Sequence, residues 1–171
     1  TLNADHGAIR ILEVGAGSGA TTEQVLAQLQ PYQHHIEAYC FSDISQAFLQ
    51  HAKQLFEPRY PFVTYQHYDV TEPLSAQAMD VAQYDIVIAT NVLHATPEIH
   101  QTLINLNAGL KHDGMLVINV VISNNLFAHA TFDLLQAWLH LIHSVFRLPA
   151  STLLFNATCM HIFSRPWVTP I

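Results

Sequence analysis

Charged side chains are scarce in this chain of 171 residues. They make up 11% of it, and only six are Lys or Arg against 13 Asp or Glu, so the formal net charge is −7 at pH 7. Proteins that bind the nucleic-acid backbone need a basic surface, so this composition argues against a nucleic-acid partner. The sequence also has no apolar run of the roughly 18 residues that a membrane-spanning helix requires, and no signal peptide opens it. We therefore expect no membrane partner.

Cysteine is rare as well. Cys40 and Cys159 are too few for a disulfide framework, which favours a reducing, cytoplasmic location. Histidine is common, with 12 residues, but neither the pair His34-His35 nor the pair His140 and His143 comes with further ligands at zinc-site spacing. The sequence therefore predicts no metal site. Hydrophobic residues make up half of the chain, enough for one domain over residues 1–171 with a sizeable core.

Three glycines at alternate positions follow an apolar run at residues 9–14. Gly15, Gly17 and Gly19 precede a helix-like segment, and a glycine loop between a strand and a helix exposes backbone N–H groups to a ligand. The spacing differs from the G-x-G-x-x-G of dinucleotide sites. Glu13, two positions before the first glycine, suits a cationic ligand such as S-adenosylmethionine, which carries an ammonium and a sulfonium. This pattern is typical of class I methyltransferases.

Apolar periodicity predicts alternating strands and helices. The expected strands are 9–14, 36–41, 62–68, 84–89 and 115–122, and the expected helices are 22–30, 45–56 and 97–110, the last capped by Thr96. Such alternation predicts a doubly wound, Rossmann-like parallel sheet with helices on both faces. The core would span residues 9–122. A C-terminal segment over 126–165 would add an apolar helix and, at 153–163, one or two closing strands.

Ligands of such sheets bind at the carboxyl ends of the strands, where four polar residues of this chain lie. Asp43 follows the second strand, roughly 20 residues after the glycine loop, and is a candidate acceptor for ribose hydroxyls. The alternative is a helix N-cap. Asp69 follows the third strand, where adenine is usually held, with an ordinary turn as the alternative. Asn91 and His94 follow the fourth strand, where a methyl acceptor would approach.

Four sequence blocks together resemble the C-methyltransferase domains of modular polyketide synthases. They are 11–22 (ILEVGAGSGATT), 41–52 (FSDISQAFLQHA), 84–102 (YDIVIATNVLHATPEIHQT) and 110–117, with a weaker match at 131–149. The resemblance implies S-adenosyl-L-methionine as cofactor and methylation of the α-carbon of a β-ketoacyl thioester. It also implies an acyl carrier protein with a phosphopantetheine-bound chain, and neighbouring synthase domains, as partners. Members of that family resemble one another in having a longer N-terminal lid, so from the few residues before the first strand we expect an excised domain or a truncated standalone protein.

The resemblance also implies a base and its partner. His94 matches the family's histidine base, which removes the α-proton, and a glutamate on the fifth strand orients that imidazole. The matching position here is Val120, beside Asn119. Three interpretations follow: an inactive structural module, slow C-methylation with His94 alone or with Asn119 as a weaker partner, or a different acceptor, as in a small-molecule O- or N-methyltransferase. Loss of such a carboxylate costs several orders of magnitude in rate in comparable sites.

Overall fold

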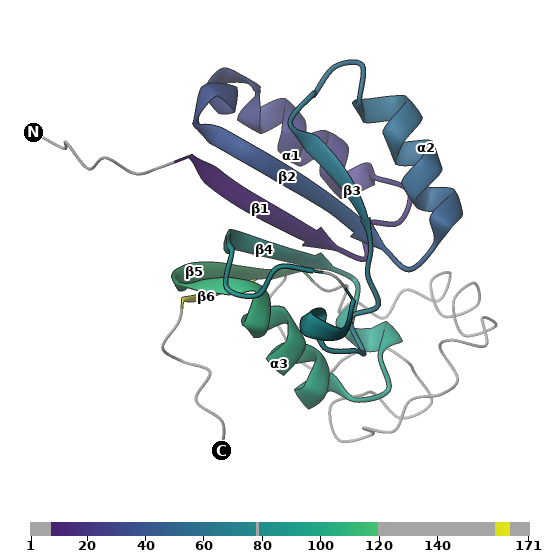
Figure 1. Cartoon of the computed structure of the whole chain (residues 1–171), viewed down its shortest axis with the longest axis vertical. Helices are drawn as coiled ribbons and strands as arrows, with labels where there is room; N and C mark the ends of the chain where they lie inside the picture. The colour runs from purple at the N-terminus through teal and green to yellow at the C-terminus, as the bar shows by residue number, and fades with distance from the viewer. Residues whose placement is uncertain (1–7, 78, 120–159, 165–171) are drawn as a thin grey trace, which may run out of the picture.

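The computed structural model describes residues 8–77, 79–119 and 160–164. Its centre is a sheet of strands β1 (Ile9–Val14), β2 (Ile36–Asp43), β3 (Val63–His67), β4 (Tyr84–Thr90), β5 (Leu110–Asn119) and β6 (Met160–Ser164). Their order in the sheet is β3-β2-β1-β4-β5-β6 (Figure 1). Strands β1 to β5 are parallel, and β6 pairs antiparallel with β5. The order reverses between β1 and β4, which is the switch point where such sheets bind ligands.

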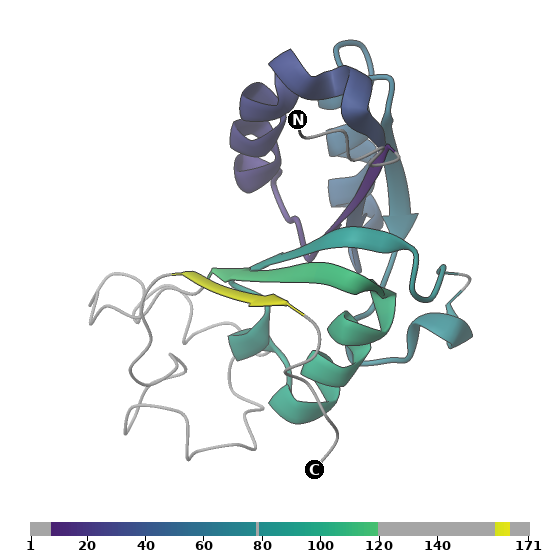
Figure 2. The ribbon, with the colours of Figure 1, turned by 90° about the vertical axis from the view of Figure 1, so that its left-hand side faces the viewer.

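Helices cover both faces of this sheet. Helices α1 (Ala20–Leu29) and α2 (Gln46–Phe56) pack on one face, where Leu26 and Phe56 join a buried cluster with Phe41 of β2. Helix α3 (Ile99–Gly109) packs on the other, where Leu106 joins a second cluster with strand residues such as Val87. Figure 2 shows α1 and α2 on the opposite side of the sheet from α3. The predicted Rossmann-like architecture is confirmed.

The central parallel strands form where apolar and β-branched residues are concentrated, because helices cover both faces of such strands. The central strand β1 has four consecutive buried residues at its C-terminal end. Strand β2 has five, and these include Ser42 and Asp43. Asp43 is the last residue of β2, two positions beyond the predicted end of that strand. It therefore lies at the carboxyl end of the strand, at the edge of the sheet.

The N-terminus of α3 differs from the prediction. Thr96 was expected to cap the helix, but the cap residue is Glu98 and the helix begins at Ile99. A short 3-10 helix, η3 (Leu93–Ala95), precedes it, and the Thr96 hydroxyl donates a hydrogen bond to the carbonyl of Leu93 at 2.9 Å. The Thr96 hydroxyl therefore stabilises the end of η3 and does not cap α3.

Other boundaries shift by a few residues. Helix α1 begins two residues before the prediction and is followed by the 3-10 helix η1 (Gln30–His35), so Pro31 ends the α-helix without ending helical structure. Strand β5 begins at Leu110, before the predicted 115. The expected closing strand is present as β6, at 160–164.

Several predictions fall outside the described residues. These are the helix within 126–149 with His140 and His143, the position of Val120, and the extent of the single domain over 1–171. No helix within the part of the chain that the structure describes is both long and apolar enough to cross a bilayer.

Candidate functional site

The glycine loop is held against the C-terminal end of β2. The N–H of Ala16 donates to the carbonyl of Ser42 at 3.0 Å, and the N–H of Gly17 donates to Oδ2 of Asp43 at 2.8 Å. Gly15 and Gly17 of this loop both have a positive φ, which favours glycine over other residues. Gly15 has φ +60°, and a Cβ on it would lie 2.7 Å from Cγ2 of Val92. Gly17 has φ +57° with nothing within 4 Å of its missing Cβ, so the protein leaves that side of the loop open.

A cavity of about 370 Å³ opens beside this loop, at the carboxyl ends of four strands. Gly15 lines it from β1, Asp43 and Ile44 from β2, residues 68–71 from β3, and residues 91–92 and 95–96 from β4. Its size falls in the range of small-molecule sites, about 300–1,000 Å³. The topology thus brings Gly15, Asp43, Asp69 and Asn91 to one cavity. This arrangement was expected, because each of these residues follows a strand of the predicted parallel sheet.

Asp43 has two structural partners at the edge of this cavity. Its Oδ2 accepts from the Gly17 N–H, and its Oδ1 accepts from the N–H of Ser45 at 2.8 Å. The second contact is an Asx turn, while the cap residue of α2 is Ser45 itself. The carboxylate therefore ties the glycine loop to the start of α2. Each carboxylate oxygen keeps a further lone pair that can accept from a ligand.

Asp69 combines the predicted turn with a place on the cavity wall. Its Oδ1 accepts from the backbone N–H and the hydroxyl of Thr71, at 2.9 and 2.6 Å. The side-chain amide of Gln77 forms hydrogen bonds with both backbone groups of Asp69. Its Oε1 accepts from the Asp69 N–H, and its Nε2 donates to the Asp69 carbonyl, each at 2.8 Å. These bonds fix the backbone of Asp69 where the carboxylate borders the cavity.

Asn91 begins the segment after β4. Its backbone has φ +55°, and its N–H donates to the carbonyl of Asn119, the last residue of β5, at 2.8 Å. His94 lies in the 3-10 helix η3, whose last residue, Ala95, also lines the cavity. The predicted partner position of His94, Val120, lies outside the described residues, so that pairing stays a prediction.

Glu13 is placed differently from the other predicted residues. Its side chain is 1% exposed, and its Oε2 accepts from the hydroxyls of Thr22 and Tyr39, each at 2.6 Å. Within the part of the chain described, its Oε1 has no hydrogen-bond partner. Burial raises the pKa of this carboxyl, and the two hydroxyl donors offset part of that rise. Because side chains alternate along β1, Val14 lines the cavity while Glu13 turns toward α1. Its contacts stabilise the base of the glycine loop.

The charges around the cavity match a cationic ligand. Asp43 and Asp69 are acidic, and the described lining residues include no Lys or Arg. A phosphate-bearing ligand would find no basic side chain there, whereas a ligand with ammonium and sulfonium groups would be attracted. The open side of Gly17 and the acceptor-rich rim fit S-adenosylmethionine.

Sequence reasoning missed several residues of the cavity wall, among them Tyr68, Thr71 and Thr96. Tyr68 directly precedes Asp69 and follows the end of β3. Its position at the carboxyl end of a strand was the sequence feature that could have identified it as a cavity residue. Its side chain is 2% exposed and belongs to the cluster under α3.

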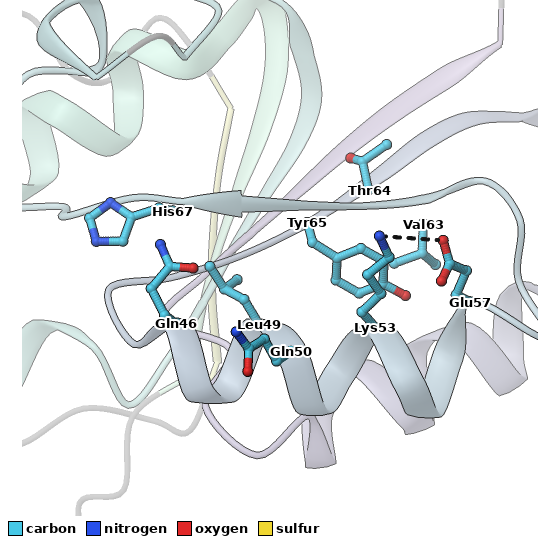
Figure 3. Close-up of a pocket in the computed structure, with 9 residues that line it drawn as sticks. All are labelled: Gln46, Leu49, Gln50, Lys53, Glu57, Val63, Thr64, Tyr65 and His67. Atoms are coloured by element: carbon cyan, nitrogen blue, oxygen red, sulfur yellow. Dashed lines mark ion pairs between the residues drawn. The ribbon is translucent and has the colours of Figure 1, made fainter.

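A second hollow of about 570 Å³ lies between α2 and β3, the edge strand of the described sheet. Lys53 of α2 and Glu57, the residue after that helix, form an ion pair of 3.9 Å along one wall of the hollow. Figure 3 shows this pair with Tyr65 of β3 beside it. The hollow contains none of the predicted site residues, and both charged side chains are more than half exposed. The smaller cavity at the glycine loop is therefore the candidate site. Among the described residues no group of three or more His, Cys, Asp or Glu side chains is arranged to hold a metal ion.

Comparisons with known proteins agree with this geometry. The chain is 48% identical over 130 residues to polyketide synthase PksM of Bacillus subtilis (strain 168), a match that covers 76% of this chain but only 3% of PksM. The DszA carbon methyltransferase has a similar structure, with a TM-score of 0.81 and 37% identity, over 90% of this chain and 39% of that one. The trans-methyltransferase CalH, solved with S-adenosylhomocysteine (SAH), has a TM-score of 0.72 and 37% identity, over 77% of this chain and 37% of that one.

The family model described as a methyltransferase domain matches residues 12–116. That match runs from β1 into β5 and contains the predicted base and cofactor-binding residues, but not the predicted partner position 120. The predicted resemblance is confirmed, and the chain belongs to the methyltransferase domain family.

Proposed function

We propose that this chain transfers a methyl group from S-adenosylmethionine to the α-carbon of a β-ketoacyl thioester carried by an acyl carrier protein. The observation that carries the proposal is the acidic cavity at the glycine loop, where Asp43 and Asp69 lie with Asn91. Similarity to carbon methyltransferases supports carbon as the acceptor. Similarity to polyketide synthases supports a carrier-bound substrate and neighbouring synthase domains as partners.

The residues of the cavity divide the binding task between them. Asp43 would accept hydrogen bonds from the ribose hydroxyls, while its existing bonds to the Gly17 and Ser45 N–H groups hold it in place. Asp69 would accept from the exocyclic amine of adenine. When bound, S-adenosylmethionine supplies a methyl group on a positively charged sulfur, which makes that methyl electrophilic. Asn91 would border the methyl group and the acceptor.

His94 would act as the base. Methylation of carbon requires the α-proton to leave, and a group with a pKa near neutrality takes it best. The proton would pass to the imidazole of His94, and the electron pair of the C–H bond would form the new bond to the methyl carbon. The bond between that methyl carbon and sulfur would break at the same time, and its electron pair would stay on the sulfur of the departing S-adenosylhomocysteine. The position of His94 in η3, next to the cavity-lining Ala95, supports this role.

The residue at position 120 favours a second candidate, an impaired or inactive methyltransferase module. A carboxylate that charges and orients the histidine is replaced by valine, and the adjacent Asn119 is a neutral amide. An amide does not stabilise an imidazolium as a carboxylate does, so we propose that C-methylation is slow in the native chain.

Binding is the first test. Calorimetric titration of the full chain with SAH should give a measurable affinity, because the glycine loop and Asp43 are in place. Gly17→Val should abolish binding, since its side chain would fill the open side of the loop. Absence of heat, and of any melting shift with either SAH or S-adenosylmethionine, would contradict the proposal.

Turnover is the second test, with a β-ketoacyl-pantetheine as substrate and methyl gain measured by mass. We expect a rate well below ~1 per second, the low end for typical enzymes. Val120→Glu should raise it, and His94→Ala should abolish it in both backgrounds. A native rate typical of enzymes would contradict the impaired reading, and an unchanged rate in His94→Ala would remove the base role.

A further inference from the structure

A buried hydrogen bond bridges the two ends of the glycine loop. Glu13 lies on β1, shortly before Gly15, and Thr22 lies in the first turn of α1, shortly after Gly19. The Thr22 hydroxyl donates to Oε2 of Glu13 at 2.6 Å. The two residues are 0% and 1% exposed, so this bond is shielded from solvent behind the loop. It joins the chain before the loop directly to the chain after it.

Strand β2 holds Glu13 from a second direction. The Tyr39 hydroxyl donates to the same Oε2 atom at 2.6 Å, and the Ser42 hydroxyl donates to the Glu13 carbonyl at 2.7 Å. Both of these residues are 0% exposed. With two donors on one oxygen the carboxylate keeps a single orientation, and Glu13 thus connects the three elements β1, β2 and α1 that meet at the loop.

The loop itself is intrinsically flexible. Gly15, Gly17 and Gly19 all have positive φ, and glycine loses more conformational freedom on folding than any other residue. Gly15 lines the candidate cavity, whereas Glu13 is not one of the described lining residues. The shape that the loop presents to a ligand therefore depends on the side chains that hold its two ends.

We propose that Glu13 and Thr22 are positioning residues of the candidate site. Their hydrogen bond holds the glycine loop in its binding shape, so Glu13 acts on the cofactor through the loop and not by contact with a ligand cation. This inference rests on the proposed function. A loop that is ordered in the free protein does not have to be ordered by the ligand, whereas a loosened loop does, and this lowers affinity.

Thr22→Val removes the hydroxyl and keeps the shape of the side chain. The affinity for SAH should fall about two- to tenfold, which is the range for one net hydrogen bond. Thr22→Ser keeps the hydroxyl, so its affinity should stay within about twofold of the native value. Tyr39→Phe should also weaken SAH binding, about two- to threefold, because the Thr22 bridge remains.

Thr102→Val is the matched control. It also removes a buried threonine hydroxyl, which donates to the Glu98 carbonyl at 2.9 Å within α3, away from the glycine loop. This variant should lower the urea midpoint about as much as Thr22→Val does and leave SAH affinity unchanged. The comparison separates an effect on the loop from a general loss of stability.

A ligand series separates positioning from charge attraction. S-adenosylmethionine carries an ammonium and a sulfonium, SAH carries only the ammonium, and SAH without its α-amino group carries neither. Glu13→Gln should weaken the binding of all three by the same factor, because none of them contacts residue 13. A direct contact with a ligand cation would make the loss largest for S-adenosylmethionine and smallest for the analogue without the amino group.

Several results would overturn the inference alone. These are equal SAH affinities of the native chain and Thr22→Val, no recovery in Thr22→Ser, an equal affinity loss in Thr102→Val, and a Glu13→Gln loss confined to the cationic ligands. If Thr22→Val does not fold, Tyr39→Phe and the Glu13→Gln series decide the question by the same criteria. No SAH binding by the native chain would overturn the proposed function and this inference with it.

Discussion

Replacing Asp43 by alanine should reduce ligand affinity and stability together, because one carboxylate serves both. Asp43 is 6% exposed and accepts from two backbone N–H groups, those of Gly17 and Ser45, each at 2.8 Å. Leaving these donors without an acceptor should cost about 2–4 kcal/mol of folding free energy in total. Loss of the bonds to the ribose hydroxyls should cost a further 2–3 kcal/mol, roughly, of binding free energy. That corresponds to a dissociation constant about 30 to 140 times higher.

Both quantities are measurable on the same preparation. Urea titration gives the free energy of unfolding, and calorimetry with SAH gives the affinity under conditions where the variant remains folded. Thr102→Val is the control, because Thr102 is buried and donates to the Glu98 carbonyl at 2.9 Å within α3, away from the cavity. It should lose about 1 kcal/mol of stability and no affinity.

Two outcomes would refute the reasoning on Asp43. An affinity within threefold of the native value, together with reduced stability, would restrict the residue to holding the loop and α2. Unchanged stability would show that its two backbone contacts do not matter to the fold.

Two further predictions concern the surroundings of the glycine loop. Gly19→Ala should lower stability by about 2–4 kcal/mol, because its φ is +84° and the new Cβ would lie 2.8 Å from a ring carbon of Phe56. Gly17→Ala, at φ +57° with open space, should cost only about 1 kcal/mol, and equal urea midpoints for the two variants would contradict the packing argument. The third prediction uses the raised pKa of Glu13: the folded state holds its proton to higher pH than the unfolded chain, so native stability should fall as pH rises from 4.5 through the raised pKa. Glu13→Gln should lack that fall, and parallel stability curves of the two proteins between pH 4 and 8 would contradict it.

Much of the fold followed from local pattern. Stretches rich in apolar and β-branched residues marked β1 and β4 to within a residue, because central strands of a parallel sheet are covered on both faces. The loop after β1 was identifiable because only glycine adopts alternate positive φ values without strain. Helix and strand boundaries were less predictable where side chains compete for backbone groups. At Thr96 the hydroxyl donates to the carbonyl of Leu93, and Glu98 is the cap residue of α3 instead.

The candidate site was predictable as a set of positions but not as a set of contacts. The placement of Asp43, Asp69 and Asn91 after successive strands implied one shared cavity, since parallel strands end at the same edge. The orientation of Glu13 was not implied, because the pattern of β1 does not say which face α1 will cover. Its bonds to Thr22 and Tyr39 exist only once α1 and β2 have packed against it.

The sequence by itself therefore determined the kind of protein this is: glycine spacing, acidic residues after strands and strand–helix alternation are local features that a methyltransferase domain requires. Only the tertiary structure decided how those features work together. The hydrogen bond from the Gly17 N–H to Asp43 depends on the register between β1 and β2. That register is a balance of packing over many distant residues, which no short stretch of the chain encodes.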